Sequence, residues 1–278
     1  MKDQQIFDRV EKKYLIDEQQ KRHLLKTIQK QMRPDDYYQS EIFNIYFDTD
    51  QFDLIIQSIE QPMFKAKLRA RSYGGYDKVF FEIKTKLCGG ENNVGYKRRM
   101  KITKKEYAKL VKKGGKIVDL VKNSAGTDVG AGESMSVSAN AGVSTRKKSK
   151  KNAPPAKTAP VSQNDLRIAE EIDYLIAHFD LKPQILVFYE RESYQGEEGL
   201  RLTFDENLKY RTRNLNFTKR KDDKNFFTDE KNIIMEIKAH EVMPLWLVKA
   251  LSAEKVYPQQ FSKISKIYQQ IRKEEQHV

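Results

Sequence analysis

Charged and apolar residues alternate along several short stretches of this 278-residue chain. The charged and polar positions recur at Lys67-x-Arg69-x-Arg71, Lys84-x-Lys86, Tyr189-x-Arg191 and Arg201-x-Thr203-x-Asp205. Apolar residues such as Leu68, Ala70, Ile83 and Leu202 occupy alternate positions in or beside these stretches. Because neighbouring side chains of a strand point to opposite faces, the pattern predicts strands that each have one charged and one apolar face.

Helical patterns separate these strands. Asp17 with Gln20, and Thr103 with Glu106, have the spacing of a capping box, which predicts a helix beginning at each pair. The predicted helices span residues 17–32, 103–113, 164–179, 244–253 and 260–274. The predicted strands span residues 7–16, 43–47, 63–73, 78–86, 95–102, 183–194, 199–210 and 233–238, with a Tyr-Gly-Gly-Tyr hairpin turn at 73–76.

Composition changes abruptly between residues 122 and 163. This segment is rich in Ser, Gly, Ala, Lys and Pro, has no aromatic residue and contains a basic run at 146–151. Such a sequence buries too little apolar surface to offset its ordering entropy, so we expect a disordered basic insertion, a solvated linker rather than a binding segment. It divides a single domain, 1–278, into a first half, 1–121, and a second half, 164–278. Strands in both halves predict one composite antiparallel sheet or barrel.

The overall charge indicates an anionic partner. Lys and Arg number 52 against 39 Asp and Glu, giving a formal net charge of +13, which favours nucleic acid, an anionic membrane or phosphorylated molecules. The single Cys88 excludes an internal disulfide, and the first residues lack the apolar run of a signal peptide. No stretch approaches the roughly 20 apolar residues of a membrane span. We therefore expect a cytosolic protein whose membrane attachment, if any, comes through a partner.

Closure of the sheet would gather the charged positions inside one surface. They are Arg9, Glu11, Lys13, Lys67, Arg69, Arg71, Glu82, Lys84, Lys86, Arg191, Arg201 and Glu236. So many cations repel one another and lose hydration, so a lumen of this kind should be wet and bind an anion, and Arg and Lys suit phosphate oxygens. An ordinary half-exposed sheet with a basic solvent face is the alternative.

Nine motifs, in order, resemble those of the vacuolar transporter chaperone (VTC) domain, a family of triphosphate tunnel metalloenzymes whose catalytic members are polyphosphate polymerases. They are Phe7-Asp8-Arg9-Val10-Glu11-Lys12-Lys13-Tyr14, Tyr46-Phe47-Asp48-Thr49, Lys67-Leu68-Arg69-Ala70-Arg71-Ser72-Tyr73, Phe81-Glu82-Ile83-Lys84, Lys97-Arg98-Arg99, Tyr189-Glu190-Arg191, Leu200-Arg201-Leu202-Thr203-Phe204-Asp205, Met235-Glu236-Ile237-Lys238 and Phe261-Ser262-Lys263-Ile264-Ser265-Lys266. The resemblance covers nearly everything outside the insertion.

The resemblance implies an α+β fold: a closed antiparallel β-barrel, or tunnel, with a basic lumen and flanking helices, in which ATP binds with a metal and polyphosphate threads through. The residues that it assigns to catalysis are Lys13, Arg69, Arg71, Lys84, Arg191 and Arg201. Those that it assigns to substrate binding are Lys67, Lys86, Lys97, Tyr189, Lys238, Lys263, Ser265 and Lys266, the last three lining or plugging an entrance. Glu236 would bind Mn²⁺ or Mg²⁺.

The first strand departs from the wider superfamily. The superfamily's hydrolases carry Glu-x-Glu-x-Lys there, whereas this chain has Arg9-x-Glu11-x-Lys13, which favours a polymerase over a triphosphatase. Glu11 and Glu82 are further metal candidates, with counter-ions to neighbouring Lys and Arg as an equally good interpretation. We therefore expect an ATP-dependent polyphosphate polymerase. A tunnel-fold triphosphatase and a non-catalytic polyphosphate or nucleic-acid binding module are the alternatives, and carboxylates among the cations disfavour nucleic acid.

Overall fold

The computed structural model describes residues 9–60, 63–87, 94–124, 162–227, 231–240 and 242–276. Its strands are β1 (Arg9–Ile16), β2 (Arg33–Asp48), β3 (Phe64–Tyr73), β4 (Lys78–Leu87), β5 (Val94–Thr103), β6 (Lys182–Gln195), β7 (Arg201–Arg211), β8 (Lys224–Asn225) and β9 (Ile233–His240). Its helices are α1 (Glu18–Gln31), α2 (Asp53–Glu60), α3 (Lys104–Lys113), α4 (Ile117–Ser124), α5 (Gln163–Phe179), α6 (Leu245–Ala253) and α7 (Lys263–Gln276), with a 3₁₀ turn at Glu197–Gly199.

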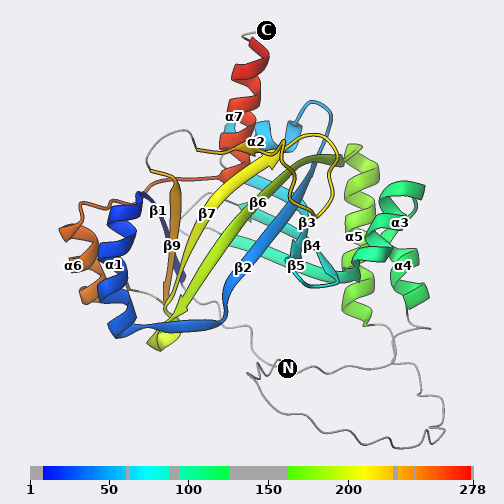
Figure 1. Ribbon diagram of the computed structural model, residues 1–278. Coiled ribbons are helices and arrows are strands. Elements are labelled where there is room, and N and C mark those ends of the chain that lie inside the picture. Colours follow the sequence, from blue (N-terminus) through cyan, green and yellow to red (C-terminus); the bar gives the residue numbers. More distant parts are fainter. Residues whose placement is uncertain are drawn as a thin grey trace, which may run out of the picture.

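The strands form one antiparallel sheet in the order β1-β9-β7-β6-β2-β3-β4-β5, and β8 pairs with β7. The sheet is strongly curved, so that β3, β4 and β5 lie behind β2, β6 and β7 (Figure 1). The expected α+β class, with an antiparallel sheet and flanking helices, is confirmed.

The predicted closure into a barrel is wrong for the described residues. Their ladders run from β1 at one edge to β5 at the other, and no ladder joins these two strands. Both edges carry cations, including Lys12 and Lys13 on β1 and Lys97, Arg98 and Arg99 on β5. Charged side chains on edge strands oppose further pairing, and like charges facing each other would add repulsion.

Alternation along β2 shows how the sheet is covered. Phe43, Ile45 and Phe47 point into a core cluster beneath α3, α4 and α5, whereas Asn44 and Tyr46 point to the other face. A second cluster joins β1, β7 and β9 to α1 and α6, and a third packs the start of α7 against β2 and β6. Helices therefore cover both ends of the sheet (Figure 1), and α2 and the start of α7 pack on the face that carries Tyr46.

Two contacts join segments that are far apart in sequence. β1 pairs with β9, bringing the beginning of the described chain beside its last strand. Asp173 of α5 accepts hydrogen bonds from the backbone N–H groups of Ile117 at 2.8 Å and Val118 at 2.9 Å, so it caps the first turn of α4. The predicted insertion lies between these helices. Residues 125–161 of it are outside the described residues, residues 122–124 belong to α4, and Gln163 begins α5.

No helix in the described ranges has both the length and the apolar character needed to cross a membrane.

Candidate functional site

Strand register brings the predicted charged positions onto one side of the sheet. Lys84 lies opposite both Lys67 and Lys97, Glu82 lies opposite Arg69 and Arg99, and Glu236 lies opposite Lys13 and Thr203. We call this surface the charged face. Its residues are Glu11, Lys13, Lys67, Arg69, Arg71, Glu82, Lys84, Lys97, Tyr189, Arg191, Arg201, Glu236 and Lys238, all predicted above, together with Tyr46, Arg99, Thr203 and Asp205.

Glu82 is surrounded by cations. It is 1% exposed and accepts hydrogen bonds from Arg69 Nε at 2.7 Å and Arg99 Nε at 2.7 Å, with Lys97 Nζ at 3.0 Å and Arg71 Nε at 4.0 Å. Burial alone would raise the pKa of Glu82, but Arg69, Arg71 and the other cations hold it far below its ordinary value. These contacts support the interpretation of Glu82 as a counter-ion over that of a metal ligand.

The lysines nearby form a ladder of like charges. Lys67 is opposite Lys84, Lys84 is opposite Lys97, and Lys65 is opposite Lys86. Burial, with Lys13 and Lys84 adding repulsion, lowers the pKa of Lys67 to about 8. Like charges directly opposite one another destabilise a sheet. A bound polyanion would remove that repulsion.

Tyr46 lies within this cationic part of the face, although the sequence did not single it out for a role. Its hydroxyl accepts a hydrogen bond from Arg69 Nη1 at 3.3 Å. Burial raises its pKa, but Arg69 and Lys67 outweigh burial and lower the pKa to about 8. The signal was present in the alternation of Asn44 and Tyr46 with the phenylalanines of β2, which places the phenol opposite Arg69.

Asp205 forms the second buried carboxylate centre of the charged face. Arg191 donates from Nε to Oδ1 at 2.5 Å and from Nη2 to Oδ2 at 2.8 Å, and Lys263 donates from Nζ to Oδ2 at 2.6 Å. Both cations also lie over the ring of Tyr189. Sequence analysis placed Asp205 within an alternating stretch but gave it no role.

The start of α7 contacts this face through the segment before it. Lys13 Nζ donates to the carbonyl oxygen of Phe261 at 3.2 Å, and Lys67 Nζ donates to Ser262 Oγ at 2.9 Å. Ser265 donates to the same Ser262 oxygen at 2.9 Å, whereas Lys266 is exposed. The predicted C-terminal group is therefore split, with Lys263 on the charged face and Ser265 and Lys266 along the helix.

The end formed by β1 and β9 balances carboxylates against lysines. Lys238 Nζ lies 2.8 Å from Glu236 and 3.8 Å from Glu11, and Lys13 lies 3.4 Å from Glu11. Burial raises the pKa of Glu236, but Lys238 and Lys13 outweigh it and lower the pKa to about 2. Thr203 Oγ1, opposite Glu236, is a buried hydroxyl with no hydrogen-bond partner in the described part of the chain.

This end offers a small set of hard oxygen ligands. Within the described ranges, no three His, Cys, Asp or Glu side chains come together as a metal-binding group. Glu236 and Glu11 would thus supply two carboxylates, and Mg²⁺ is commonly bound by one or two carboxylates with substrate phosphates and water completing its shell. The residues present fit a divalent cation that binds together with a phosphorylated substrate.

The remaining predicted residues differ in their exposure. Arg201 is exposed and donates to Asp35 at 2.6 Å, while Arg71 is buried and donates to Asn44 at 2.8 Å. Lys86 is exposed at the end of β4. The side chain of Arg9, and the whole of Cys88, lie outside the described residues.

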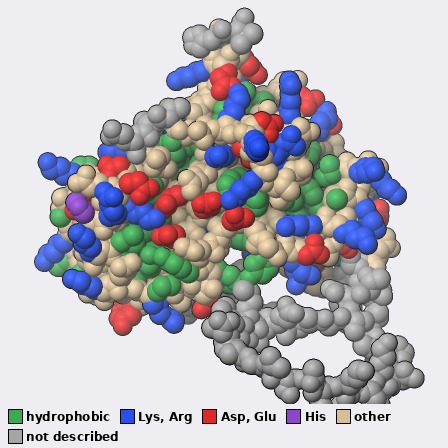
Figure 2. Space-filling view, in the orientation of Figure 1, with side chains coloured by type: hydrophobic (Ala, Val, Ile, Leu, Met, Phe, Trp, Pro, Cys, Tyr) green, Lys and Arg blue, Asp and Glu red, His purple; other side chains and the backbone are tan. Residues whose placement is uncertain are grey.

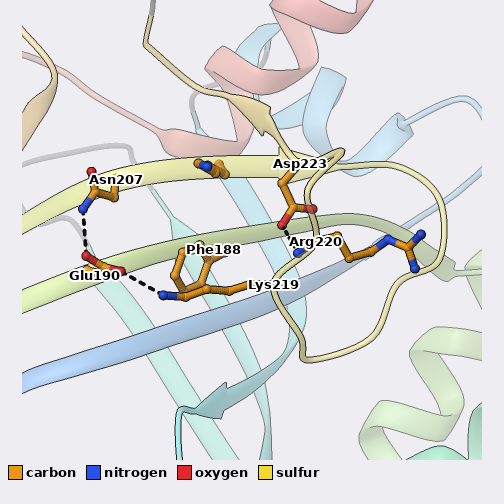
Figure 3. A pocket seen from close by; sticks show the side chains of 7 residues that line it. Phe188, Glu190, Asn207, Lys219, Arg220 and Asp223 are labelled. Atoms are coloured by element: carbon orange, nitrogen blue, oxygen red, sulfur yellow. Dashed lines mark hydrogen bonds and ion pairs between the residues drawn. The ribbon is translucent and has the colours of Figure 1, made fainter.

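A pocket of about 260 Å³ lies on the other side of β6, at a bulge where Asn207 has a φ of 50° (Figure 3). Glu190 in this pocket is already paired, since it accepts from Lys219 at 2.9 Å and from Asn207 at 2.7 Å. The surface over β2, β6 and β7 likewise intermixes basic and acidic side chains (Figure 2).

Comparison with protein families identifies the chain. The model of the VTC domain matches residues 8–271. The chain belongs to the VTC domain family. The family expected from the nine sequence motifs is thus confirmed.

A relative of this VTC domain is the vacuolar transporter chaperone complex subunit 4 of Schizosaccharomyces pombe. The two are 25% identical over 171 residues, which cover 60% of this chain and 20% of that protein. The chain therefore spans about a fifth of the length of this relative.

Solved structures resemble the VTC domain more distantly. The PH1819 protein of Pyrococcus horikoshii OT3 has a TM-score of 0.43 and 11% identity over 94% of this chain and 99% of its own. A putative adenylyl cyclase from Hippeastrum, described as having a dominant triphosphatase activity, has a TM-score of 0.46 and 14% identity over 92% of this chain and 93% of its own. Likeness at this level is too remote to carry an inference about function.

Proposed function

We propose that this VTC domain is a metal-dependent polyphosphate polymerase, which transfers the γ-phosphoryl group of ATP to the end of a growing polyphosphate chain. The observation that carries the proposal is the opposition of Lys84 to both Lys67 and Lys97, three cations in a row across neighbouring strands, of which Lys67 is half-buried and the other two are exposed. Like charges directly opposite one another repel, and a bound anion would relieve that repulsion. A chain of phosphates offers anionic oxygens at a spacing that several cations can share.

The cations of the β3–β5 end would bind the triphosphate. Arg69 and Arg99 are held by Glu82, which fixes the direction of their guanidinium groups, while Lys67 and Lys84 supply movable charge. Arg191 and Lys263 approach the same face from β6 and α7. Together these groups would neutralise charge on the phosphates and bring the two reacting ends into contact.

Glu236, with Glu11 beside it, would hold Mn²⁺ or Mg²⁺. Bound there with the triphosphate, the metal would supply charge neutralisation at the oxygens of the transferring group. Lys238 and Lys13 lower the pKa of Glu236 and so keep that carboxylate ionised, and both lysines also lie beside Glu11. The buried hydroxyl of Thr203 offers a further oxygen next to Glu236.

The transfer itself requires little acid–base chemistry. An anionic oxygen of the terminal phosphate attacks the γ-phosphorus, the bond from the γ-phosphorus to the β–γ bridging oxygen breaks, and ADP leaves with that oxygen. No proton must be removed from the nucleophile, so positioning and electrostatic stabilisation account for the catalysis. A surface of Lys and Arg without a general base suits this reaction.

The partners follow from the same proposal. ATP and inorganic polyphosphate would be the substrates, nucleic acid would not be bound, and the domain would work in the cytoplasm. The relative that it resembles is a subunit of a vacuolar transporter chaperone complex. We infer that a membrane protein of such a complex receives the product.

One observation favours triphosphatase activity as a second candidate. Glu11 and Glu236 lie on neighbouring strands around Lys238, and two carboxylates can also orient water for hydrolysis.

Incubation with ATP and Mn²⁺ or Mg²⁺, with products resolved by length on a gel, separates the candidates. Long chains together with ADP support the polymerase. ADP and orthophosphate without chains identify a triphosphatase, and intact ATP together with tight polyphosphate binding identifies a binding module.

A further inference from the structure

Asp205 is the most completely buried acidic group on the charged face. Its exposed fraction is 0%, and both carboxylate oxygens are engaged, Oδ1 by Arg191 and Oδ2 by Arg191 and Lys263. Burial raises the pKa of Asp205, but Arg191 and Lys263 outweigh burial and hold it far below its ordinary value. The group is therefore a buried anion at neutral pH.

Two cations from different elements meet at this carboxylate. Arg191 comes from β6 and Lys263 from the first turn of α7, 72 residues later in the chain. The guanidinium carbon of Arg191 lies 5.4 Å from the ring centre of Tyr189, and Lys263 Nζ lies 4.7 Å from it. Carboxylate and ring thus fix both cations from two directions.

We propose that Asp205 is a positioning residue for phosphoryl transfer, holding Arg191 and Lys263 in fixed orientations toward one phosphate group. This inference rests on the proposed function. Asp205 acts through the two cations and does not itself touch the substrate, which its negative charge would repel. Glu82 does the same for Arg69 and Arg99 on the other side of the face.

The charges at this site predict that loss of Asp205 affects phosphate affinity and kcat differently. An anion site gains affinity from more positive charge, and Asp205 cancels one of the two charges that it holds. The benefit of Asp205 must therefore lie in orientation, which is expressed in the transition state more than in the bound ground state. Loss of Asp205 should lower kcat without weakening the binding of the phosphate chain.

The test is a double-mutant cycle with Asp205→Asn and Arg191→Lys. Lysine keeps the charge of Arg191 but cannot form the two-pronged contact with a carboxylate. We expect each single variant to lower kcat at least about tenfold, and the double variant to be no slower than the worse single variant, because both changes break the same unit. We also expect the Kd of Asp205→Asn for tripolyphosphate, measured by calorimetry, to be unchanged or lower.

The control is Glu190→Gln, which makes the same change of charge one residue from Arg191 but on the opposite side of β6, where Glu190 pairs with Lys219. It should leave kcat and Kd unchanged. If Asp205→Asn does not fold, Asp205→Glu keeps the charge and moves it by one methylene, and the positioning role predicts a lower kcat for that variant as well. A normal kcat in Asp205→Glu would show that charge alone matters.

Two outcomes would overturn the inference. Independent, multiplicative losses of kcat would show that Asp205 and Arg191 do not act as a unit, and loss of tripolyphosphate affinity in Asp205→Asn at a normal melting temperature would show that Asp205 serves binding. If the wild-type protein binds tripolyphosphate but does not turn over ATP, the polymerase proposal fails separately. The same cycle is then measured in Kd, where non-additive effects support the coupling of Asp205 to Arg191 and additive effects refute it.

Discussion

The two ends of the charged face differ in how far their carboxylates neutralise their cations. At the β3–β5 end, one buried carboxylate, Glu82, is shared by four cations, Arg69, Arg71, Lys97 and Arg99, and Lys67 and Lys84 lie opposite each other on the neighbouring strands. At the end formed by β1 and β9, Glu11 and Glu236 alternate with Lys13 and Lys238, so that charges are nearly balanced. The first end retains uncompensated positive charge and suits an anion.

The balanced end suits a cation that arrives with that anion. Glu236 at this end is ionised because neighbouring lysines offset the effect of burial on its pKa. The difference between the ends teaches that net charge alone does not define the site. A phosphate chain and a metal ion require opposite surroundings, and one curved sheet can offer both a short distance apart.

The largest effect should come from the balanced end. Replacing Glu236 with Gln removes the carboxylate proposed to bind the metal, and we expect metal-dependent turnover of ATP to fall at least about a thousandfold. Tripolyphosphate binding without metal should persist, because the lysine ladder is untouched. The measurement is chain synthesis on a gel beside calorimetry. Glu171→Gln, which alters a surface pair with Arg98 on the other side of the sheet, is the matched control. Unchanged turnover in Glu236→Gln would refute the assigned role.

At the cationic end, the strongest effect should be on stability. Glu82→Gln would leave Arg69, Arg71 and Arg99 without their common counter-ion, and we expect the free energy of unfolding to fall by about 3 kcal/mol. Denaturant unfolding at pH 7 measures the change. Addition of tripolyphosphate should restore part of the loss by supplying replacement negative charge. A variant as stable as the wild type would mean that these cations do not depend on Glu82.

A smaller effect is expected when one cation is removed. Arg69→Ala should weaken tripolyphosphate binding by about tenfold to a hundredfold, because charge-assisted hydrogen bonds contribute about 1.5–3 kcal/mol each. Arg98→Ala is the control, since Arg98 pairs with Glu171 on the opposite side of β5. Equal affinities of the two variants, measured by calorimetry, would remove Arg69 from the binding surface.

The smallest effect on tripolyphosphate affinity should come from a change of pH. The pKa of Lys67 and that of Tyr46 both lie at about 8. As pH rises from 7 to 9, Lys67 loses positive charge and Tyr46 gains negative charge, so both changes weaken anion binding. We expect the affinity for tripolyphosphate to fall roughly fivefold. Lys67→Met should flatten this dependence, and the same titration of Lys67→Met corrects for ionisation of the ligand itself. An equally steep curve in Lys67→Met would assign the pH dependence elsewhere.

Local signals in the sequence predicted much of the fold. The capping boxes at Asp17 and Thr103 are present with both reciprocal hydrogen bonds. Strand β2 was underestimated, because residues before 42 are polar and do not alternate, yet pairing with β6 extends the strand back to Arg33. Helix α2 was missed. Asp48, whose carboxylate accepts from the backbone of Leu54 and Ile55, is the cap that the sequence did not reveal.

The sequence predicted which residues of the candidate site share a strand face, but not which of them form ion pairs with one another. Alternation showed that Arg69, Glu82 and Arg191 belong on charged faces. It could not show that Glu82 meets four cations or that Asp205 joins Arg191 to Lys263, because those contacts depend on the register between strands and on the docking of α7. Register between distant segments is set by the packing of the whole sheet, which no short window of sequence contains.

The cap that Asp173 provides for α4 bears on where such a domain can accept insertions and deletions. Because α4 and α5 are joined by this cap and share one core cluster, the placement of the two helices does not depend on the segment, residues 125–161, that connects them. The entropy of closing a loop grows only with the logarithm of its length, by about 0.6 kcal/mol for each doubling. Insertions and deletions between these two helices can therefore accumulate with little effect on folding, so this position tolerates new sequence while the sheet and its charged face are preserved.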